Sequence, residues 1–312
     1  MTTSAPGGHY DLIIIGTGSG NSIIGPEMDG WRIAVVERFK FGGTCLNHGC
    51  IPTKMFVYAA DLARHASQHD GNARMGIRTQ FLGADWPAIR DRVFGRIDPI
   101  EDGGRGYRKS LANVDCFEAS ARFLGDHTID AGGVRLTADR IVVAAGCRPL
   151  IPAIPGLDSV PFHTSDTVMR IDQLPKHLII LGGGFIACEF AHVFSSLGSK
   201  VTVVNRGRQL LRAEDHDISV RFTELATDHF DTVLGAAVDG VRAVGDGIAV
   251  DVTTAAGVQV LEGDCLLVAM GRVSNADQLD VSAGGIATDS RGFVQVDQHG
   301  RTSSPGVWAL GD

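Results

Sequence analysis

The stretch that decides the fold is Tyr10-Asp-Leu-Ile-Ile-Ile-Gly16, a run of large aliphatic residues that breaks into glycine and continues as Thr17-Gly-Ser-Gly-Asn21. Ala34-Val-Val-Glu37 follows about twenty residues later. Strand, glycine-rich turn, helix and second strand in this order make up the unit that binds dinucleotides in α/β proteins. The sequence therefore predicts such a unit at the start of the chain.

The same plan occurs a second time along the chain. His177-Leu-Ile-Ile-Leu-Gly-Gly-Gly184 is followed by Val201-Thr-Val-Val204. Each half also closes on a late strand that runs into a glycine, Ile141-Val-Val-Ala-Ala-Gly146 and Leu266-Leu-Val-Ala-Met-Gly271. We therefore expect an α/β protein with two tandem Rossmann-like dinucleotide-binding domains.

The composition of the chain excludes some classes of function. The chain has 312 residues, enough for two domains, and a formal net charge of −8, which argues against a nucleic-acid surface. The start, Met1 to His9, lacks the pattern of a signal peptide, and no apolar stretch approaches the ~18 residues of a membrane helix. We expect a cytoplasmic protein with no membrane partner, in which disulfides are not structural.

Prolines mark the crossing between the two halves. Pro149, Pro152 and Pro155 lie between them, so we expect a first domain over 1–152, a second over 153–272 and a return segment over 273–312. The chain ends on Val307-Trp-Ala-Leu-Gly-Asp312, an apolar run cut off at its turn, which we interpret as a truncation.

The first glycine motif is expected to bind a pyrophosphate. Gly16 makes the turn, Gly18 lets the phosphates approach the backbone, and the following helix N-terminus supplies N–H donors. Glu37 ends the second strand, where a carboxylate can bind ribose hydroxyls. Asn21 departs from the fingerprint, which has Gly or Ala there for close packing of helix on strand.

The second glycine motif favours NADPH over NADH. It has the small Ala187 at the third fingerprint position, but its second strand ends in Asn205 with no acid for a ribose diol. Arg206, Arg208 and Arg212 follow, and guanidinium groups are suited to a 2′-phosphate. The alternative is a solvated basic loop.

Cys45 and Cys50 are the candidate redox groups. In an ideal helix, residues five apart differ by ~7.5 Å in rise, beyond the usual Cα spacing of a disulfide. The two can pair only if the backbone between them is distorted, which Gly49 and Pro52 permit. Taken alone, such a pair is more often unpaired or metal-binding, but its place directly after the first nucleotide unit favours a redox role.

No metal site is expected, because the other nearby ligand type is His48 alone, more typical of a loop residue, and no second Cys/His pair follows. The remaining cysteines adjoin apolar segments and are interpreted as structural thiols: Cys116, Cys147, Cys188 and Cys265.

These motifs resemble those of the glutathione reductase and lipoamide dehydrogenase family, the class I pyridine nucleotide–disulfide oxidoreductases. The resemblance runs in order over nearly the whole chain, through GTGSGN (16–21), GGTCLNHGCIPTK (42–54), AAGCRP (144–149), GGGFIACEF (182–190), GRVSN (271–275) and TSSPGVWALGD (302–312). Within the family, KMFVYAADLA (54–63), RVFGRIDPI (92–100) and HTSDTVMRI (163–171) look most like members that reduce mycothione, the disulfide of mycothiol.

The resemblance implies FAD in the first domain, NADPH in the second, and Cys45 with Cys50 as a redox disulfide. FAD would be held by Gly16, Gly18, Ser19, Gly20, Glu37, Thr44, Lys54, Ala121, Gly146 and Asp312. NADPH would contact Gly182, Gly184, Phe185, Ile186, Glu189, Arg206, Arg212 and Gly271. Phe185 would be an aromatic lid over the nicotinamide, or else core packing. Lys54 and Glu189 would form a buried ion pair near the flavin.

The resemblance also implies a reaction. NADPH would reduce FAD, the flavin would reduce the disulfide through Cys50, which would take thiolate character, and Cys45 would attack the external disulfide to give two thiols. A C-terminal interface domain, expected to be missing here, would build the homodimer and supply a His–Glu acid–base pair. The alternatives are another disulfide reductase, a dihydrolipoamide dehydrogenase, or an FAD- and NADPH-binding fragment with incomplete catalysis.

Overall fold

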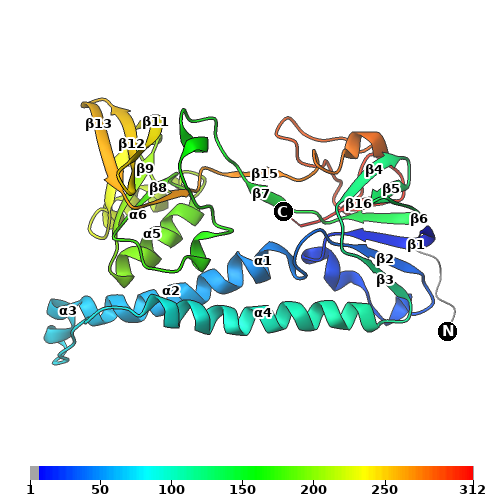
Figure 1. Ribbon diagram of the computed structural model, residues 1–312, viewed down its shortest axis with the longest axis horizontal. Helices are drawn as coiled ribbons and strands as arrows, with labels where there is room; N and C mark the ends of the chain where they lie inside the picture. Colours follow the sequence, from blue (N-terminus) through cyan, green and yellow to red (C-terminus); the bar gives the residue numbers. More distant parts are fainter. Residues whose placement is uncertain (1–6, 312) are drawn as a thin grey trace. The chain divides into compact units, whose positions relative to one another are not determined.

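The computed structural model describes residues 7–311, and of residues 69 and 70 only the backbone. The chain divides into two compact units (Figure 1). The first unit comprises Met1–Asn47, Arg96–Arg148 and Arg272–Asp312, and the second comprises His48–Gly95 and Pro149–Gly271. These units are defined by compactness, and residues 48–95 group with the second one. The division by function into 1–152, 153–272 and 273–312 is a different statement and stays a prediction.

The first unit is built on a seven-stranded sheet in the order β3-β2-β1-β6-β5-β4, with β16 paired to β6. Its strands are β1 (Gly8–Ile15), β2 (Ile33–Val36), β3 (Val114–Phe117), β4 (Ala121–Gly125), β5 (Thr128–Ala131), β6 (Val134–Val143) and β16 (Val307–Ala309). Strands β3, β2, β1, β6 and β16 are parallel, whereas β4 and β5 are antiparallel. The parallel order with β1 in the middle is the Rossmann arrangement that the first motif predicts.

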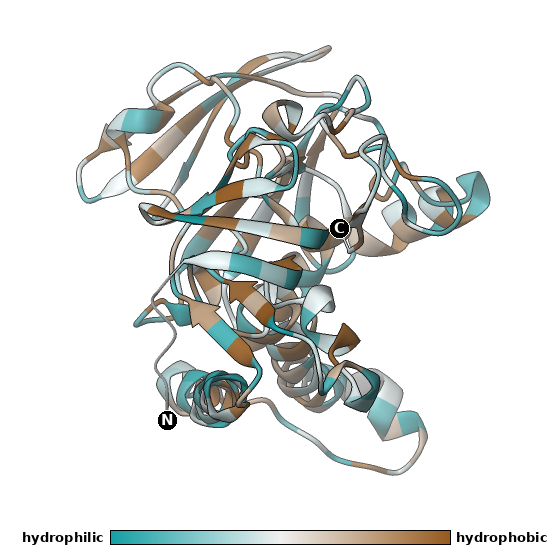
Figure 2. Cartoon of the chain, turned by 90° about the vertical axis from the view of Figure 1, so that its right-hand side faces the viewer, coloured by the Kyte–Doolittle hydropathy of each residue, from teal (hydrophilic) through white to brown (hydrophobic). Residues whose placement is uncertain are grey.

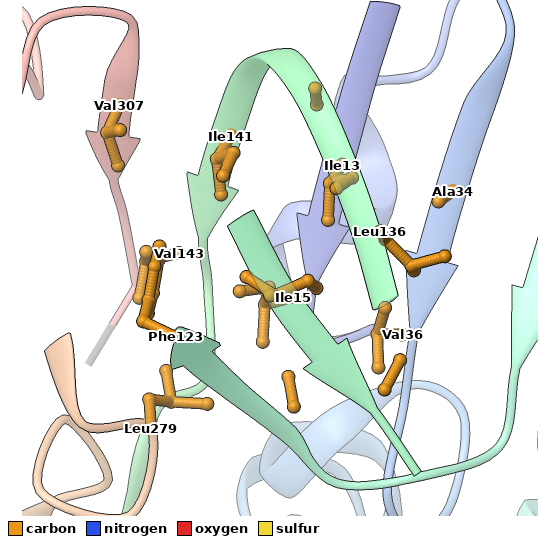
Figure 3. Packing of buried hydrophobic residues seen from close by; sticks show 14 of the residues in the cluster. Ile13, Ile15, Ala34, Val36, Phe123, Leu136, Ile141, Val143, Leu279 and Val307 are labelled. Carbon is orange, nitrogen blue, oxygen red and sulfur yellow. The ribbon is translucent and has the colours of Figure 1, made fainter. Parts of the chain in front are cut away.

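Both faces of this sheet are covered, which explains why β1 ends in four consecutive buried aliphatic residues, 12–15. Side chains alternate between the faces of a strand. Ile13 and Ile15 accordingly join one core cluster, with Phe123 of β4, and Figure 3 shows them packed together. Leu12 and Ile14 join another cluster. Figure 2 shows hydrophobic (brown) segments along the strands, interrupted by hydrophilic (teal) ones.

The expected helix after the first glycine turn is absent, and that prediction is wrong. Only two short 3-10 helices follow, η1 (Ser19–Ile23) and η2 (Pro26–Met28). Pro26 lacks the N–H needed to continue a helix and biases the residue before it toward extended backbone. Ile24 and Gly25 are both extended, as this effect requires.

The first unit has a few further elements. They are α1 (Gly43–Asn47), the later part of α4 (Trp86–Ser110), η5 (Val281–Gly284), and the paired short strands β7 (Cys147–Pro149) and β15 (Arg272–Ser274), along which the chain leaves the unit and returns.

The second unit repeats the parallel plan and is, as predicted, Rossmann-like. Its four-stranded parallel sheet has the order β10-β9-β8-β14, from β8 (His177–Leu181), β9 (Lys200–Asn205), β10 (Asp231–Leu234) and β14 (Cys265–Val268). An antiparallel sheet is made by β11 (Ala237–Val244), β12 (Gly247–Thr254) and β13 (Gly257–Gly263). Its helices are α2 (Cys50–Ser67), α3 (His69–Arg74), the start of α4, η3 (Leu157–Ser159), η4 (Val168–Arg170), α5 (Phe185–Leu197) and α6 (His216–Ala226).

Three aromatic rings hold α2 against α5. Phe56 of α2 stacks on Trp86 of α4, and Trp86 packs on Phe194 of α5, with 5.1 Å between ring centroids in each pair. The Trp86 indole also donates a hydrogen bond to the Ile171 carbonyl at 2.8 Å. Buried aromatic pairs of this kind stabilise helix packing beyond the area that they bury. The start of α2 and the start of α5 are therefore held in fixed relation.

Candidate functional site

The first glycine turn leaves a surface without side chains. Gly16 has φ +101°, and a Cβ there would lie 2.2 Å from the Ala144 carbonyl oxygen, so Gly is required. A Cβ on Gly43 would lie 2.7 Å from the Gly18 Cα, so the two backbones meet closely. Such bare backbone can approach a phosphate, and in this respect the turn fits the pyrophosphate of FAD.

Glu37 stands at the end of β2 as predicted and is only 9% exposed. Its carboxylate accepts hydrogen bonds from Thr17 N at 2.9 Å, from Thr17 Oγ1 at 2.6 Å and from Phe39 N at 2.9 Å. The carboxylate therefore ties the glycine turn to the second strand. Thr17 is a residue that the sequence analysis did not single out.

The other predicted FAD residues of the first unit lie around the carboxyl ends of its parallel strands. Ser19 begins η1, and a Cβ on Gly311 would lie 3.5 Å from the Ser19 hydroxyl, so the turn after β16 reaches the first glycine turn. A cavity at this end is lined by Gly146, Ala145 and Gly311 among others. The carboxyl edge of a parallel sheet is where dinucleotides bind.

Three further predicted FAD residues differ in their surroundings. Gly20 is buried against Ala144, and Thr44 is the second residue of α1. Ala121 begins β4 and its side chain belongs to the core, so a cofactor contact there would come from its backbone. Asp312 lies outside the described residues.

The second glycine turn has the same backbone geometry as the first at its leading glycine. Gly182 has φ +119°, and a Cβ there would lie 2.2 Å from the Ala269 carbonyl oxygen. Here the expected helix is present: Gly184 precedes α5, which runs for 13 residues. Ala187 is fully buried, as close packing of helix and strand requires. This turn fits a nucleotide pyrophosphate at a true helix N-terminus.

Asn205 organises the basic loop that follows β9. Its amide nitrogen donates to the Gly207 carbonyl at 3.1 Å and to the Gln209 carbonyl at 2.9 Å. The Leu211 N–H donates to the Gly183 carbonyl at 2.7 Å, which brings the loop back to the glycine turn. The side chains of the three arginines, Arg206, Arg208 and Arg212, are exposed on this loop.

The remaining predicted NADPH residues lie at the same end of the second unit. Phe185 is the first residue of α5 and is 63% exposed, so the alternative that it is core packing is wrong. Ile186 follows it, and Gly271 has φ +132° with its carbonyl accepting from Leu150 N at 2.9 Å.

The two candidate redox cysteines lie on separate helices. Cys45 is in α1 and Cys50 is the first residue of α2, so the backbone between them leaves helical geometry, as pairing would require. Gly49, with φ −129° and ψ −123°, accounts for it, whereas Pro52 sits inside the first turn of α2, where proline is tolerated. Both cysteines are exposed.

Lys54 and Glu189 form the predicted ion pair, between α2 and α5. The pair is not buried, however, and that part of the prediction is wrong: the Lys54 side chain is 65% exposed. The first turn of α2 faces a cavity of about 510 Å³, lined by Cys50, Ile51, Lys54, Met55, Tyr58 and Arg92. Since exposed ion pairs add little stability, the pair contributes little to folding.

The other cysteines behave as structural thiols. Cys147, Cys188 and Cys265 are buried and Cys116 is partly buried. Burial raises the pKa of Cys188 and of Cys265 to about 12, and it also raises the pKa of Cys116. Such thiols stay protonated and unreactive. His48, between the two redox cysteines, has its Nε2 3.9 Å from Asp166.

One contact was missed from the sequence. Arg108 of α4 is buried and donates from Nε to Asn21 Oδ1 at 2.6 Å and from Nη2 to the Asn21 carbonyl. The departure of Asn21 from the fingerprint was a signal that this position has a special partner.

Residues 7–311 contain no helix long and apolar enough to cross a membrane. In the same part of the chain, three or more His, Cys, Asp or Glu side chains do not gather into a metal-binding group.

Comparison with known proteins gives consistent matches. The model of the pyridine nucleotide-disulphide oxidoreductase family matches residues 10–312. Mycothione reductase of Mycobacterium tuberculosis strain H37Rv is 46% identical over 97% of this chain and 66% of its own length. Glutathione reductase of Burkholderia cepacia is 32% identical, with 97% and 66% covered.

Among solved structures, the HOCl-induced flavoprotein disulfide reductase RclA from Escherichia coli superposes with a TM-score of 0.83 at 30% identity. It covers 97% of this chain and 66% of its own. The chain therefore spans slightly less than two thirds of the length of the proteins it matches.

Proposed function

The chain belongs to the pyridine nucleotide-disulphide oxidoreductase family, and we propose that it carries the FAD site, the NADPH site and the redox cysteines of an enzyme that reduces mycothione to mycothiol. The observation that carries the proposal is Cys50 at the N-terminus of α2, with Lys54 one turn later paired to Glu189. Identity of 46% to a mycothione reductase, above the 32% to a glutathione reductase, supports mycothione as the disulfide.

The cysteines would exchange disulfides in two steps. FAD, when bound, would supply the two-electron chemistry by which NADPH reduces the disulfide of Cys45 and Cys50. The Cys45 thiolate then attacks one sulfur of mycothione, and a mixed disulfide forms as the first mycothiol leaves as a thiolate. Cys50 attacks the Cys45 sulfur, which releases the second mycothiol and restores the disulfide. Two electrons and two protons convert one disulfide into two thiols.

Lys54 and Glu189 would act on the electron transfer to the disulfide. The ammonium group of Lys54 is held by the Glu189 carboxylate within the turn that begins at Cys50. A fixed positive charge at this place would stabilise negative charge that develops beside the cysteine. Glu189 keeps the ammonium in position, so loss of either partner should slow reduction of the disulfide rather than its exchange with substrate.

Asn205 and the basic loop support NADPH as the electron donor. The position that would hold an acid for an NADH ribose is an amide committed to two backbone carbonyls. We therefore assign Arg206 and Arg212 to the 2′-phosphate. NADPH dependence separates this proposal from a dihydrolipoamide dehydrogenase: strong preference for NADH in turnover would contradict it.

Two broader proposals follow from the family. We propose that the full-length enzyme is a homodimer in the cytoplasm, as the resemblance implies, and sedimentation of the full-length protein tests the first point.

Anaerobic titration with NADPH tests the relay itself. We expect the flavin absorbance to bleach, followed by a long-wavelength absorption band that needs the Cys50 thiolate. Cys50→Ser should remove the band and all mycothione reduction, whereas Cys45→Ser should keep the band and lose mycothione reduction. Cys188→Ser is the matched control, because its thiol is buried. A wild-type level of mycothione reduction in Cys50→Ser would contradict the proposal.

A further inference from the structure

Arg108 is a buried cation that pairs with no carboxylate in the described part of the chain. It is 8% exposed, and its described partners are Asn21 and the ring of Tyr107, 5.3 Å from its Cζ. Arginine is almost never buried unless its charge is paired, because an unpaired charge loses its hydration. A negative charge is therefore expected to complete the surroundings of Arg108.

The guanidinium is attached to the first glycine turn. Its Nε donates to the Asn21 side-chain oxygen and its Nη2 donates to the Asn21 backbone carbonyl. The Arg108 side chain therefore holds both the side chain and the backbone of Asn21. The Asn21 N–H in turn donates to the Gly18 carbonyl at 3.1 Å. Arg108 thus fixes the backbone of the turn whose glycines form the bare surface for phosphate.

This turn lacks the positive helix end that its counterpart has. The second turn is followed by the 13 residues of α5, whereas the first is followed by the five residues of η1. The dipole effect of a helix comes from aligned peptides and their free N–H groups, which a single 3-10 turn scarcely provides. The charge that attracts a phosphate must therefore come from elsewhere, and Arg108 is the buried cation attached to this turn.

We propose that Arg108 is a positioning residue for the pyrophosphate of FAD. It holds the Gly16–Asn21 turn in shape through Asn21, and it supplies the positive charge that a helix N-terminus supplies in the second unit. The proposal rests on the FAD site assigned above, and it explains why this sequence has Asn where the fingerprint has Gly or Ala.

The test compares Arg108→Gln with Arg105→Gln in the full chain. Arg105 lies one turn earlier on α4 and loses the same charge, but it is paired with Asp102 and Glu118. We expect Arg108→Gln to raise the FAD dissociation constant of the apoprotein by about 10- to 100-fold, as for a charge-assisted hydrogen bond. Arg105→Gln should change it less than about threefold.

Nucleotide fragments separate the phosphate from the rest of FAD. ADP should raise the melting temperature of the wild-type apoprotein, and this shift should be lost in Arg108→Gln, while the shift caused by adenosine is kept. A purely structural role would weaken both ligands equally, and that result would overturn the proposal, as would an unchanged FAD dissociation constant. If Arg108→Gln does not fold, Arg108→Lys and Asn21→Ala give the same readout: the first should keep the ADP shift, and the second should reduce it.

Failure of the underlying assignment looks different. If the wild-type chain itself binds no FAD, the FAD site falls and the role of Arg108 falls with it. If the wild-type binds FAD and Arg108→Gln binds it equally well, only the role of Arg108 is overturned.

Discussion

The two glycine turns of this chain share one strand frame and differ in everything built on it. Gly16 faces Ala144 as Gly182 faces Ala269, each with the same 2.2 Å approach of an added Cβ to the carbonyl oxygen. Beyond that frame, the first turn continues into a 3-10 helix and the second into a long α-helix.

The residue after the second strand shows the same contrast. Glu37 accepts hydrogen bonds from Thr17, whereas Asn205 donates to the loop that carries the arginines. The comparison teaches that the parallel strands fix where a nucleotide can bind, while single side chains at equivalent positions decide which nucleotide binds and what balances its charge.

The largest effect on stability is expected from substituting the first glycine of each turn. Gly16→Ala and Gly182→Ala each place a Cβ against a backbone oxygen at positive φ, which neither strand can avoid. We expect each to destabilise its unit by about 3–5 kcal/mol, in the range of severe backbone strain. Urea unfolding measures this, with bound FAD as the reporter of the first unit and NADPH affinity as the reporter of the second. Gly133→Ala is the control that separates the clash from the backbone strain, since its φ is also positive, +89°, but no atom lies within 4 Å of a Cβ there.

The next largest effect is expected from changing the charge of Glu37 and Asn205, at the equivalent strand ends, with little change in side-chain shape. Glu37→Gln places an amide against three donors, and Asn205→Asp places a carboxylate against two carbonyls. Each should weaken its own nucleotide about 10- to 100-fold, from the cost of mispaired charge-assisted bonds. We expect FAD affinity to fall in the first variant and NADPH affinity in the second, measured by calorimetry. Equal loss of NADH and NADPH affinity in Asn205→Asp would contradict the assignment of the basic loop.

The smallest effect concerns two histidines whose pKa values move in opposite directions. In the first unit, burial alone would lower the pKa of His127, but hydrogen bonds to the Pro305 and Ala138 carbonyls outweigh it and raise the pKa. In the second, burial and then Lys200 lower the pKa of His177. His127 therefore adds stability below its unfolded pKa that is lost as pH rises through the folded value, whereas the contribution of His177 is lost as pH falls.

Melting temperatures between pH 5 and 7 check these signs. Relative to the wild type, His127→Gln should be less stable mostly at pH 5. When the pH is lowered from 7 to 5, the melting temperature of His177→Gln should fall less than that of the wild type. Parallel pH profiles for the two variants would show that the opposite shifts are absent.

Much of the fold follows from local pattern. The apolar runs before Gly16 and before Gly182 became β1 and β8, because parallel strands covered on both faces need unbroken apolar sequence. The pairing of Lys54 with Glu189 was also accessible from motif positions. These features depend on residues within one or two elements.

The sequence-based predictions were wrong or incomplete where residues distant in the chain, or competing local effects, determine the structure. The helix expected after Gly16 was lost to Pro26, a helix breaker that the fingerprint alone does not take into account. The Arg108–Asn21 contact joins residues 87 positions apart, which no local pattern reveals. The exposure of Lys54 depends on what surrounds α2 in space, and charge type alone does not fix that.

The close approach of Gly18 and Gly43 also limits how the gene can vary in length. The two backbones are locked together, and Cys45 follows only two residues after the second contact point. An insertion next to either glycine would shift the cysteine relative to the glycine turn. Insertions and deletions should therefore be tolerated in the surface loop after η2, around Asp29 and Gly30, where no atom lies within 4 Å of an added Cβ on Gly30.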